Sequence, residues 1–367
     1  MAVVVTGASG FIGRNLIVRL RERKLDIIAL GSDATESAWR QAAEQADFVF
    51  HLAGVNRPQD DAEFISGNTD VTRTLCRMLE DAGKTTPIVY ASSIQAERHN
   101  AYGRSKRAAE NILLEHSYRT GSPVRIFRLA NVFGKWARPN YNSAVATFSH
   151  NIAHGLEITV HDANASLSLV HVDDVCAAFV ELLESPITGA DFIEARPVYS
   201  TTVGEIAELI RSYARSRETL VTDRVGQGLQ RALYSTYLSY LEPDAFAYDV
   251  PRHADSRGVF VEMLKTPDCG QFSYFTAGPG ITRGEHYHHA KTEKFLVLTG
   301  TARFSFRHIL THQRHEIITE GGQGRIVETI PGWTHDITNI GSTEMVVMLW
   351  ANEIFDRSRP DTIAEKV

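Results

Sequence analysis

The sequence predicts two domains of different fold class: an α/β domain built on a doubly wound parallel sheet, followed by an all-β barrel. The chain has 367 residues, which suits two domains of roughly 100–200 residues each. Its first half alternates short β-branched runs with longer helical patterns, whereas beyond about residue 255 short strand-like runs are separated by glycines. We therefore assign residues 1–245 to the first domain and 246–367 to the second, with a weakly periodic linker over 216–253.

The first domain is expected to repeat a strand–helix unit. The expected strands are Ala2–Thr6, Asp26–Leu30, Asp47–Leu52, Pro87–Ala91 and Val124–Leu129. The expected helices are Phe11–Arg23, Glu36–Gln45, Asp60–Ala82 and Ala101–Arg119. Because parallel neighbours need a long crossover connection, this alternation predicts a parallel sheet with helices on both faces.

The second domain is expected to be a barrel of short strands. The expected strands are Gly258–Leu264, Gln271–Thr276, Lys294–Leu298, Ala302–Phe306, His315–Thr319, Gly324–Ile330 and Glu344–Trp350. Short strands with glycine turn signals are typical of sandwiches and barrels. Eight of the 15 histidines follow residue 250, so the two domains also differ in their chemistry.

Composition narrows the function classes. A net charge of −6, from 38 basic and 44 acidic residues, argues against nucleic-acid binding. The three cysteines are few and widely spaced, which excludes a disulfide framework. No apolar run reaches the ~20 residues of a membrane span, and the start MAVVVTGASG lacks a charged signal-peptide region. We therefore expect a soluble cytoplasmic enzyme that binds neither nucleic acid nor membrane.

A glycine-rich turn follows the first expected strand and opens the first expected helix. In TGASGFIG the glycines are Gly7, Gly10 and Gly13. Glycines in this context let the backbone approach a pyrophosphate, which the helix N-terminus stabilises. The motif predicts a Rossmann-type dinucleotide site. The expected cofactor-binding residues of the turn and of the end of the third strand are Gly7, Ser9, Gly10, Phe11, Ile12, Gly13, Arg14, Leu52, Ala53 and Gly54.

A tyrosine and a lysine share one face of a later helix. Tyr102 and Lys106 are four residues apart, so the ammonium can lower the tyrosine pKa and make the phenol a usable acid or base. Ser92 and Ser93 lie just upstream, after the fourth strand, where a hydroxyl can hold a substrate carbonyl beside the tyrosine.

Taken together, these motifs resemble the extended short-chain dehydrogenase/reductase family. The shared features are TGxxGxxG, HLAG at His51–Gly54, the serine pair and YxxxK, and the resemblance covers residues 1–245. It implies Ser93, Tyr102 and Lys106 as the catalytic set, with Ser92 as the alternative serine. It also implies that Asn131 lies near a nucleotide-sugar.

Two departures from that family bear on the ligands. The second strand ends in Leu30-Gly31-Ser32 without the acid that usually binds the NAD ribose, so Ser32 and Arg14 are expected to receive the 2′-phosphate of NADPH. An arginine for the sugar-nucleotide phosphates is absent before HVDDV. Lys135 and Arg138 are the replacement candidates, with a solvated loop as the alternative reading.

The second domain contains a spaced set of histidines and one glutamate. His286 and His288 point to one side of a strand, Glu293 follows shortly, and His335 comes from a later strand. Three nitrogens and one oxygen suit Zn²⁺ or another divalent ion with an open position. The spacing resembles the two motifs of the cupin family. A metal-free cupin that uses its histidines for acid–base work is the alternative. Tyr287 and Lys265 are candidate acid–base groups at the barrel mouth.

Across its whole length the chain resembles the CapF-type bifunctional enzymes of bacterial capsule and O-antigen synthesis. HLAGVNRP, FGKWARPNYNS and HYHHAKTEKFLVLTG are among the shared stretches. The resemblance implies a homodimer acting on a UDP-linked 4-keto-6-deoxy-N-acetylhexosamine. It implies C3 epimerisation in the cupin and then NADPH-dependent C4 reduction, giving UDP-2-acetamido-2,6-dideoxy-L-talose on the route to UDP-N-acetyl-L-fucosamine. The alternatives are a single-activity reductase with a structural cupin, and a non-catalytic NADPH or sugar sensor.

Overall fold

A computed structural model describes residues 1–58, 60–185, 187–255, 258–261, 263–264, 266, 270–353 and 358–367. They form two compact units, each drawn from several stretches of the chain. The first unit comprises Met1–Phe133, Tyr141–Ser143 and Leu167–Ser200. The second comprises Gly134–Asn140, Ala144–Ser166 and Thr201–Val367. The units therefore do not divide at residue 245, because the chain passes between them more than once.

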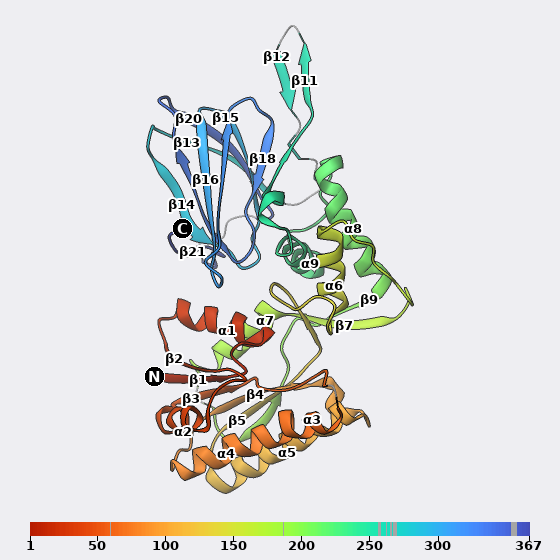
Figure 1. Ribbon diagram of the computed structural model, residues 1–367, viewed down its shortest axis with the longest axis vertical. Coiled ribbons are helices and arrows are strands. Elements are labelled where there is room, and N and C mark those ends of the chain that lie inside the picture. The colour runs from red at the N-terminus through yellow and green to blue at the C-terminus, as the bar shows by residue number, and fades with distance from the viewer. Residues whose placement is uncertain are drawn as a thin grey trace. The chain divides into compact units, whose positions relative to one another are not determined.

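The first unit contains a six-stranded parallel sheet in the order β2-β1-β3-β4-β5-β8 (Figure 1). Its strands are β1 (Ala2–Thr6), β2 (Asp26–Leu30), β3 (Phe48–His51), β4 (Ile88–Ser93), β5 (Val124–Leu129) and β8 (Ala190–Ile193). The order reverses between β1 and β3, and ligands of such sheets bind outside the carboxyl ends of the strands at that reversal. The predicted Rossmann-type parallel sheet is confirmed.

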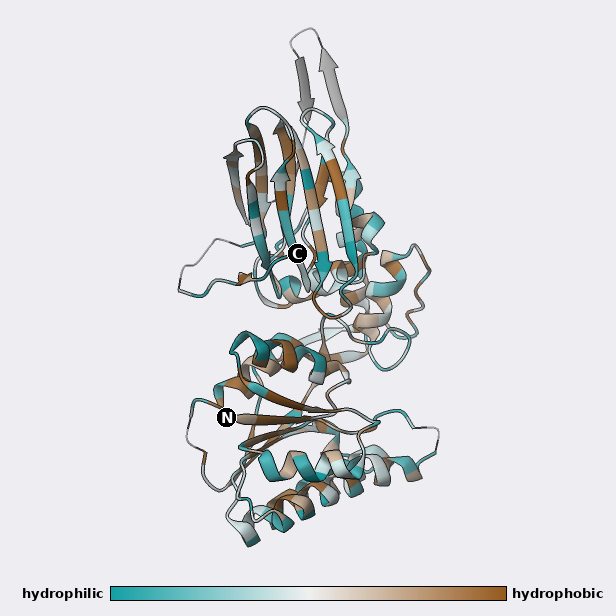
Figure 2. Ribbon diagram, turned by 60° about the vertical axis from the view of Figure 1, so that its left-hand side comes forward, coloured by the Kyte–Doolittle hydropathy of each residue, from teal (hydrophilic) through white to brown (hydrophobic). Residues whose placement is uncertain are grey.

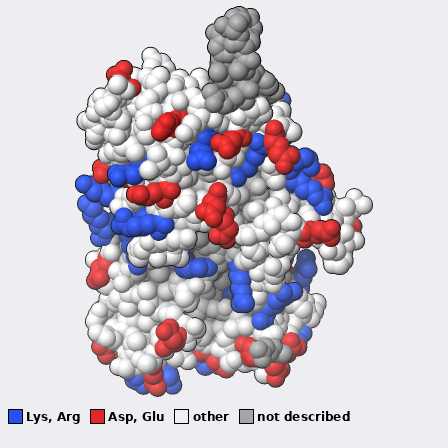
Figure 3. Space-filling view, turned by 45° about the horizontal axis from the view of Figure 1, so that its top comes forward, with Lys and Arg blue, Asp and Glu red and all other residues white. Residues whose placement is uncertain are grey.

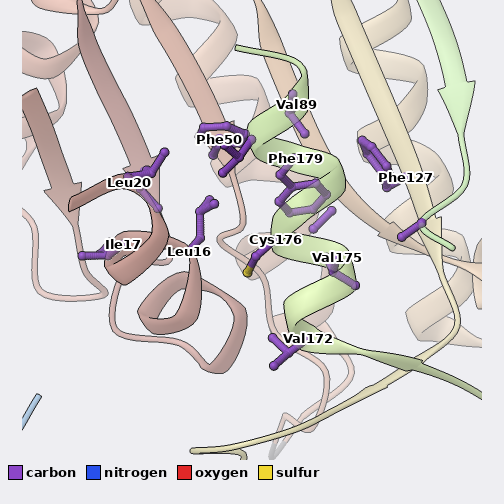
Figure 4. Close-up of a cluster of buried hydrophobic side chains, with 14 of the residues drawn as sticks. Leu16, Ile17, Leu20, Phe50, Val89, Phe127, Val172, Val175, Cys176 and Phe179 are labelled. Atoms are coloured by element: carbon purple, nitrogen blue, oxygen red, sulfur yellow. The ribbon is translucent and has the colours of Figure 1, made fainter. Parts of the chain in front are cut away.

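Helices cover both faces of this sheet. They are α1 (Phe11–Glu22), α2 (Glu36–Gln45), α4 (Val71–Asp81), α5 (Ala101–Thr120) and α7 (Val172–Glu181). Along β1, Val3 and Val5 pack with α1 and α7, while Val4 packs with α2, α4 and α5. This alternation follows from the two-residue period of a strand. Figure 4 shows Leu16 of α1 and Phe179 of α7 in the first of these clusters, and Figure 2 shows how apolar the strands are.

The helix expected over Asp60–Ala82 is interrupted. The structure has a short α3 (Ala62–Phe64), a π-helical turn (Ile65–Asp70) and then α4. The Asn68 side chain accepts from the Val55 N–H at 3.0 Å and donates to the Val55 carbonyl at 2.9 Å. The wider turn points this amide at the loop after β3, a placement that local propensity does not encode.

The first unit also contributes most of a small three-stranded sheet. Its strands are β6 (Asn131–Phe133), β7 (Ser166–His171) and β9 (Tyr199–Thr202), with β7 in the middle. Asn131 lies in β6, and its amide donates to the Ser168 carbonyl at 3.2 Å.

Among the described residues, the second unit contains three α-helices. They are α6 (Ala144–Ala153), α8 (Val203–Thr219) and α9 (Gly228–Leu238). The α9 helix occupies the stretch that we expected to be a linker. All residues from Ala232 to Leu238 are buried, including two tyrosines, a serine and a threonine. A helix buried on every side shows no apolar stripe, which explains why its periodicity is weak in the sequence.

The β part of the second unit consists of two five-stranded antiparallel sheets, ordered β10-β18-β15-β20-β13 and β17-β16-β19-β14-β21. The first sheet contains β10 (Ala247–Asp249), β13 (Gln271–Ala277), β15 (Glu293–Thr299), β18 (Arg325–Glu328) and β20 (Met345–Ala351). The second contains β14 (Thr282–Tyr287), β16 (Thr301–His308), β17 (Arg314–Glu320), β19 (Trp333–Asn339) and β21 (Ile363–Ala364). A further hairpin joins β11 (Arg252–Asp255) and β12 (Gly258–Val261). An all-β second region is thus present.

Strands β14 and β19 are absent from our predicted set of strands, although both carry residues of the predicted metal site. Their sequences, TRGEHY and WTHDITN, are rich in polar residues that hide the alternation of a half-buried strand. The two strands pair directly, with His286 opposite His335.

The second unit buries charges in an ion-pair network beside α8. Glu328 of β18 accepts hydrogen bonds from Arg217 of α8 and Lys294 of β15, and Lys294 also donates to the Tyr248 hydroxyl at 2.7 Å. Burial alone would raise the pKa of Glu328, but the two cations hold it at about 2. The network fixes α8 against the first of the two β sheets.

The surface carries mixed charge. On the face shown in Figure 3, Lys and Arg side chains are interspersed with Asp and Glu. Among the helices of the described residues, none combines the length and apolar character needed to cross a bilayer.

Candidate functional site

The glycine turn lies at the reversal of the parallel sheet, between β1 and α1. Gly7 has φ +65°, and a Cβ there would lie 2.7 Å from the Ala53 nitrogen. A Cβ on Gly13 would lie 2.2 Å from the Gly7 carbonyl oxygen. Gly10 caps α1 without a side chain, so the first N–H groups of the helix point outward. This arrangement is suited to a pyrophosphate.

A buried hydrogen-bond network fixes the chain after β3 beside this turn. The Thr6 hydroxyl accepts from the Leu52 and Ala53 N–H groups at 3.1 Å and contacts His51 Nδ1 at 2.8 Å. His51 Nε2 lies 2.9 Å from the Thr72 hydroxyl. Burial and the nearby Lys106 charge lower the pKa of His51 to about 3, so the ring is neutral. The His51 ring thus connects β1 to α4 through hydrogen bonds. Of the residues predicted to bind the cofactor, Leu52 and Ala53 lie against Gly7.

Ser93, Tyr102 and Lys106 meet at the carboxyl end of β4. Ser93 ends β4 and lies close enough to Tyr102 to lower the pKa of the phenol. The α5 helix begins close by because Gly103 lets it approach: a Cβ there would lie 2.2 Å from the Gln95 carbonyl oxygen. Lys106, one turn further along, is buried and donates to the Ala91 carbonyl at 2.9 Å.

The structure distinguishes between the two serines. The Ser92 hydroxyl donates to Glu110 at 2.5 Å in a buried contact, and Glu110 also binds Arg128 through both carboxylate oxygens. Ser92 is therefore committed to a structural network behind β4. Ser93 faces the tyrosine instead.

Burial sets the ionisation of this site. It lowers the pKa of Lys106 to about 8, against the opposing charge of Glu110. It raises the pKa of Tyr102, and the nearby Ser93 side chain only partly offsets the rise. The lysine was expected to lower the tyrosine pKa, but here burial outweighs any such effect. The phenol is thus protonated at neutral pH and able to donate a proton.

Asn68 and Glu110 are further members of this site that the sequence did not point to. The Asn68 amide donates to the Ser105 hydroxyl at 2.9 Å. A Cβ on Gly54 would lie 2.7 Å from Asn68 Oδ1 and 3.2 Å from Lys106 Nζ, so the amide and the ammonium share one small space. Asn68 reaches the site from the π-helical turn, whereas Glu110 lies on α5 one turn after Lys106. Neither residue belongs to the YGRSK motif.

Of the two residues expected to bind the 2′-phosphate, Ser32 follows the end of β2 and Arg14 lies in α1. Ser32 is exposed and Arg14 is half-buried. Asp33 follows at once, and a Cβ on Gly31 would lie 2.7 Å from its Oδ1 and 3.7 Å from the Ser9 hydroxyl. The Asp33 carboxylate thus folds back over Gly31.

The expected phosphate-binding residues Lys135 and Arg138 belong to the second unit. Lys135 is buried, with its ammonium 5.3 Å from the centre of the Trp136 ring, whereas Arg138 is exposed. The solvated-loop alternative is therefore wrong for Lys135. Trp136 has φ +69° and covers Gly332, where a Cβ would lie 2.8 Å from its ring.

The four expected metal ligands come together in the second unit. The candidate ligand atoms of His286, His288, Glu293 and His335 all lie within 4.8 Å of one another. Glu293 Oε2 is 3.2 Å from His288 Nε2 and 3.6 Å from His335 Nε2. A β-bulge at Gly284, which has φ +101°, turns His286 into the group.

The histidines are oriented by their second nitrogens. His286 Nδ1 lies 3.0 Å from the Gly284 carbonyl, and His288 Nδ1 contacts the Asp361 carbonyl. Each contact turns Nε2 of the ring towards the group. Burial lowers the pKa of His286 to about 3 and also lowers that of His335. Neutral rings of this kind are the form that binds metal.

The group passes a fit test for a divalent metal. Among the described residues, neither ring nitrogen of the buried His335 has a hydrogen-bond partner. Burial alone would raise the pKa of Glu293, but the His288, His335 and Lys291 contacts hold it well below its usual range. One carboxylate oxygen and three imidazole nitrogens form a donor set that suits Zn²⁺.

Of the two acid–base candidates, Tyr287 does not join this group. Tyr287 follows His286 on β14, so its side chain points to the other face, where it is buried 5.5 Å from the His289 ring. Lys265 lies outside the described residues. A lysine that the sequence analysis passed over, Lys291, is instead 2.7 Å from Glu293 Oε1.

A parallel sheet with a glycine turn after its first strand is typical of one class of proteins, those that depend on a nicotinamide dinucleotide. The model of the NAD dependent epimerase/dehydratase family matches residues 3–193, and that of the polysaccharide biosynthesis C-terminal domain matches residues 253–363. The chain belongs to the NAD dependent epimerase/dehydratase family and, within it, to the CapF-type sugar-nucleotide enzymes. Membership implies a nicotinamide cofactor.

Two relatives match the entire chain. The UDP-2-acetamido-2,6-beta-L-arabino-hexul-4-ose reductase of Pseudomonas aeruginosa is 54% identical over 365 residues, covering 99% of this chain and 98% of that protein. The capsular polysaccharide assembling protein CapF from Staphylococcus aureus is 40% identical, with full coverage of both chains and a TM-score of 0.69. The UDP-glucose 4-epimerase of Thermus thermophilus shares the fold alone, at 21% identity over 58% of this chain and 83% of its own, with a TM-score of 0.50. The resemblance inferred from the sequence is confirmed.

Proposed function

We propose that this chain converts a UDP-linked 2-acetamido-2,6-dideoxy-4-hexulose in two steps, C3 epimerisation in the second unit and C4 reduction in the first. The observation that carries the reductase assignment is the position of Ser93 beside a protonated, half-buried Tyr102, one helical turn from the buried Lys106. The name of the Pseudomonas relative, a 4-ulose reductase of the same length and architecture, supports this substrate class.

In the reductase step, the chain's own residues hold the ketone and supply a proton. Ser93 donates a hydrogen bond to the C4 carbonyl oxygen. Tyr102 protonates that oxygen as it becomes an alkoxide, and Lys106 stabilises the negative charge that remains on the phenolate. NADPH, when bound, supplies the hydride for C4.

The cofactor is assigned from the end of β2. Ser32 and Arg14 would receive the 2′-phosphate, while the Asp33 carboxylate, folded over Gly31, would oppose it. Replacing this acid, as in Asp33→Asn, should therefore increase the preference for NADPH over NADH. Kinetics with both cofactors check this, and an unchanged ratio would contradict the assignment.

The substrate would be held through its nucleotide and its sugar. Asn131 lies on β6 near the carboxyl end of the sheet and is assigned to the nucleotide-sugar. The cations Lys135 and Arg138 are assigned to the diphosphate, since the Ser166-Leu167-Ser168 segment offers none.

In the second unit, we infer a cupin with a divalent metal, Zn²⁺ in the first instance, on His286, His288, Glu293 and His335. A 4-keto group acidifies the hydrogen on C3, so a base can remove it and leave an enolate, and reprotonation on the other face inverts C3. The metal would supply electrostatic stabilisation of the developing oxyanion. A ligating histidine cannot also be the free base, so the base is another group.

The two steps suit one polypeptide because the second draws the first forward. Epimerisation beside a ketone is readily reversed, whereas reduction removes the ketone. The product would be UDP-2-acetamido-2,6-dideoxy-L-talose, on the route to UDP-N-acetyl-L-fucosamine. A homodimer, implied by the resemblance, is checked by light scattering.

The test is the product mass after incubation of the full chain with NADPH and the UDP-4-keto-6-deoxy-N-acetylhexosamine in deuterated water. Reduction together with one carbon-bound deuterium at C3 is expected. Reduction without carbon-bound deuterium would leave a single-activity reductase with a structural second unit. Binding of NADPH and sugar without turnover would leave a sensor. A parallel sample stripped of metal by a chelator should lose C3 exchange and still reduce substrate that is already epimerised.

A further inference from the structure

The residues 358–367 form a segment that runs across the histidine–glutamate group of the second unit. Its strand β21 pairs with β14, with Ala364 opposite His286 and Ile363 opposite Tyr287 (Figure 1). Glu365 extends the contact, because its N–H donates to the Glu285 carbonyl at 2.9 Å and its carbonyl accepts from the Thr334 hydroxyl at 2.5 Å. The segment, here called the strap, thus borders both strands that carry histidine ligands.

Asp361 of the strap binds the turn between His288 and Glu293. Its Oδ1 accepts from the His289 N–H at 2.9 Å, and its Oδ2 accepts from the N–H groups of Ala290 and Lys291 at 2.7 Å each. Three successive backbone N–H groups therefore converge on one buried carboxylate. Such charge-assisted bonds are about twice as strong as neutral ones.

The same residue also sets the orientation of a ligand. The Asp361 backbone carbonyl accepts from Nδ1 of His288, which directs Nε2 of that ring at Glu293. Partners of this kind fix the tautomer and direction of metal-binding histidines. One residue therefore holds the ligand His288 directly and the turn leading to the ligand Glu293.

Other charges packed around Asp361 keep it in place. Arg231 of α9 lies 3.7 Å from Asp361 Oδ2 and 3.0 Å from Glu353. Burial alone would raise the pKa of Asp361, but His289, His288 and the backbone N–H groups hold it below its usual range. The carboxylate is therefore an anion in a site prepared for one.

We propose that Asp361 is a positioning residue of the metal site, holding His288 and the 289–291 turn in the geometry that binds the ion. This inference rests on the proposed metal site. By the reciprocity of linked equilibria, the strap tightens metal binding and the metal tightens the strap to the same degree. Asp361 touches neither the ion nor the substrate.

The first test compares two strap variants in the full chain. In Asp361→Asn one carboxylate oxygen is replaced by an NH₂ group, which cannot accept a hydrogen bond. In either orientation of the amide this NH₂ group faces a backbone N–H donor, at His289 or at Ala290 and Lys291. Glu365→Gln is the matched control, since the Glu365 carboxylate binds only the Arg307 side chain among these groups. Zinc affinity is measured by competition with a chromophoric chelator, with circular dichroism confirming that each variant is folded.

We expect Asp361→Asn to weaken zinc binding by about 10–100-fold, and Glu365→Gln to leave it near wild type. At saturating Co²⁺, the visible spectrum of Asp361→Asn should also differ from wild type, which a merely destabilised protein would not show. Wild-type zinc affinity and an unchanged cobalt spectrum in the folded Asp361→Asn protein would overturn the proposal.

Amide hydrogen exchange tests the proposal in two further cases, absence of zinc binding by the wild-type chain and failure of the variant to fold. If the wild-type chain binds no zinc, the metal site itself fails, and the positioning role is judged by the amides of 289–291, which must exchange faster in Asp361→Asn. If that variant does not fold, the wild-type chain is compared with and without zinc. Added protection of 358–367 on zinc binding supports the proposal, and its absence overturns it.

Discussion

The two candidate sites of this molecule are built in opposite ways. The first is made mainly of backbone: glycines that no other residue can replace, strand ends, and one buried cation, Lys106. The second is made of side chains, with three histidines and a glutamate beside the buried Arg217–Glu328–Lys294 network. Substitutions that add side-chain atoms should therefore disturb the first site most. Substitutions that remove a charge should disturb the second unit most.

The largest expected effect separates the two chemistries. Tyr102→Phe should lower C4 reduction by about 10²–10⁴-fold, because the phenol is the proton donor, while C3 hydrogen exchange continues. Reduction is followed through NADPH absorbance and exchange by mass spectrometry. Tyr118→Phe, at a fully solvent-facing position of α5, is the control and should change neither. Loss of both reactions in Tyr102→Phe would refute separate sites.

The next effect concerns charge in the second unit. Glu328→Gln leaves Arg217 and Lys294 without their buried partner, and should lower the free energy of unfolding of this unit by about 3–5 kcal/mol. Since the folded pKa of Glu328 is about 2 and its ordinary value is 4.5, the stabilisation is fully present above pH 4.5. It is lost as the pH falls towards 2.

Urea unfolding at pH 7 and pH 3, followed by near-ultraviolet circular dichroism, measures this difference. Glu36→Gln removes a carboxylate from the exposed pair with Arg40 and should leave the transition where it is. Equal effects of the two variants would show that the buried network adds nothing beyond surface pairing.

A smaller effect is expected from bulk in the first unit. Gly13→Ala places a Cβ 2.2 Å from the Gly7 carbonyl oxygen and should cost about 1–3 kcal/mol of stability, with weaker NADPH binding. Thermal unfolding and fluorescence titration with NADPH check both. Gly278→Ala, whose Cβ meets only Ile281 at 3.8 Å, is the comparison. If Gly13→Ala binds NADPH with the wild-type affinity, the close approach of Gly13 to Gly7 is not required for cofactor binding.

The smallest effect per measurement is a pH dependence of the first unit, because it is spread over several pH units. The folded pKa of Lys106, about 8, lies below its ordinary 10.5, so the native state binds fewer protons than the unfolded chain between these values. Stability should rise with pH across this window, by at most about 1.4 kcal/mol per pH unit. The rise should be missing in Lys106→Met, and the exposed Lys24→Met variant controls for net charge. Parallel pH curves for wild type and Lys106→Met would contradict the assigned burial cost.

What the sequence could predict follows the same division. The glycine turn and YGRSK each lie within one strand–turn–helix or one helix, so their spacing already implies their geometry. Histidine and glutamate are rare enough together that their spacing indicated the second site as well. Asn68 and Asp361 were missed because each is a common residue type that a distant segment brings to its site. Glu110 was missed because it lies outside the YGRSK motif, although it is on the same helix.

The fold was predictable to a similar depth. The helices and strands of the parallel sheet follow from period and β-branched runs, and most of their bounds agree within a residue or two. The α9 helix and strands β14 and β19 could not be predicted, since their polar residues mask the hydrophobic pattern expected of a helix or strand. The two units could not be delimited from the pattern of strands and helices alone, because the chain passes between them more than once.

That crossing has a consequence for synthesis on the ribosome. The α6 helix ends at Ala153, but it packs against α8 and α9, and α9 ends at Leu238, 85 residues later (238 − 153). At about 5–20 residues per second, the apolar residues of α6 wait roughly 4–17 s for their partners. During that interval the nascent chain offers a hydrophobic segment to chaperones and to neighbouring chains. Slow codons between residues 154 and 238 would lengthen this exposure and lower the yield of folded protein.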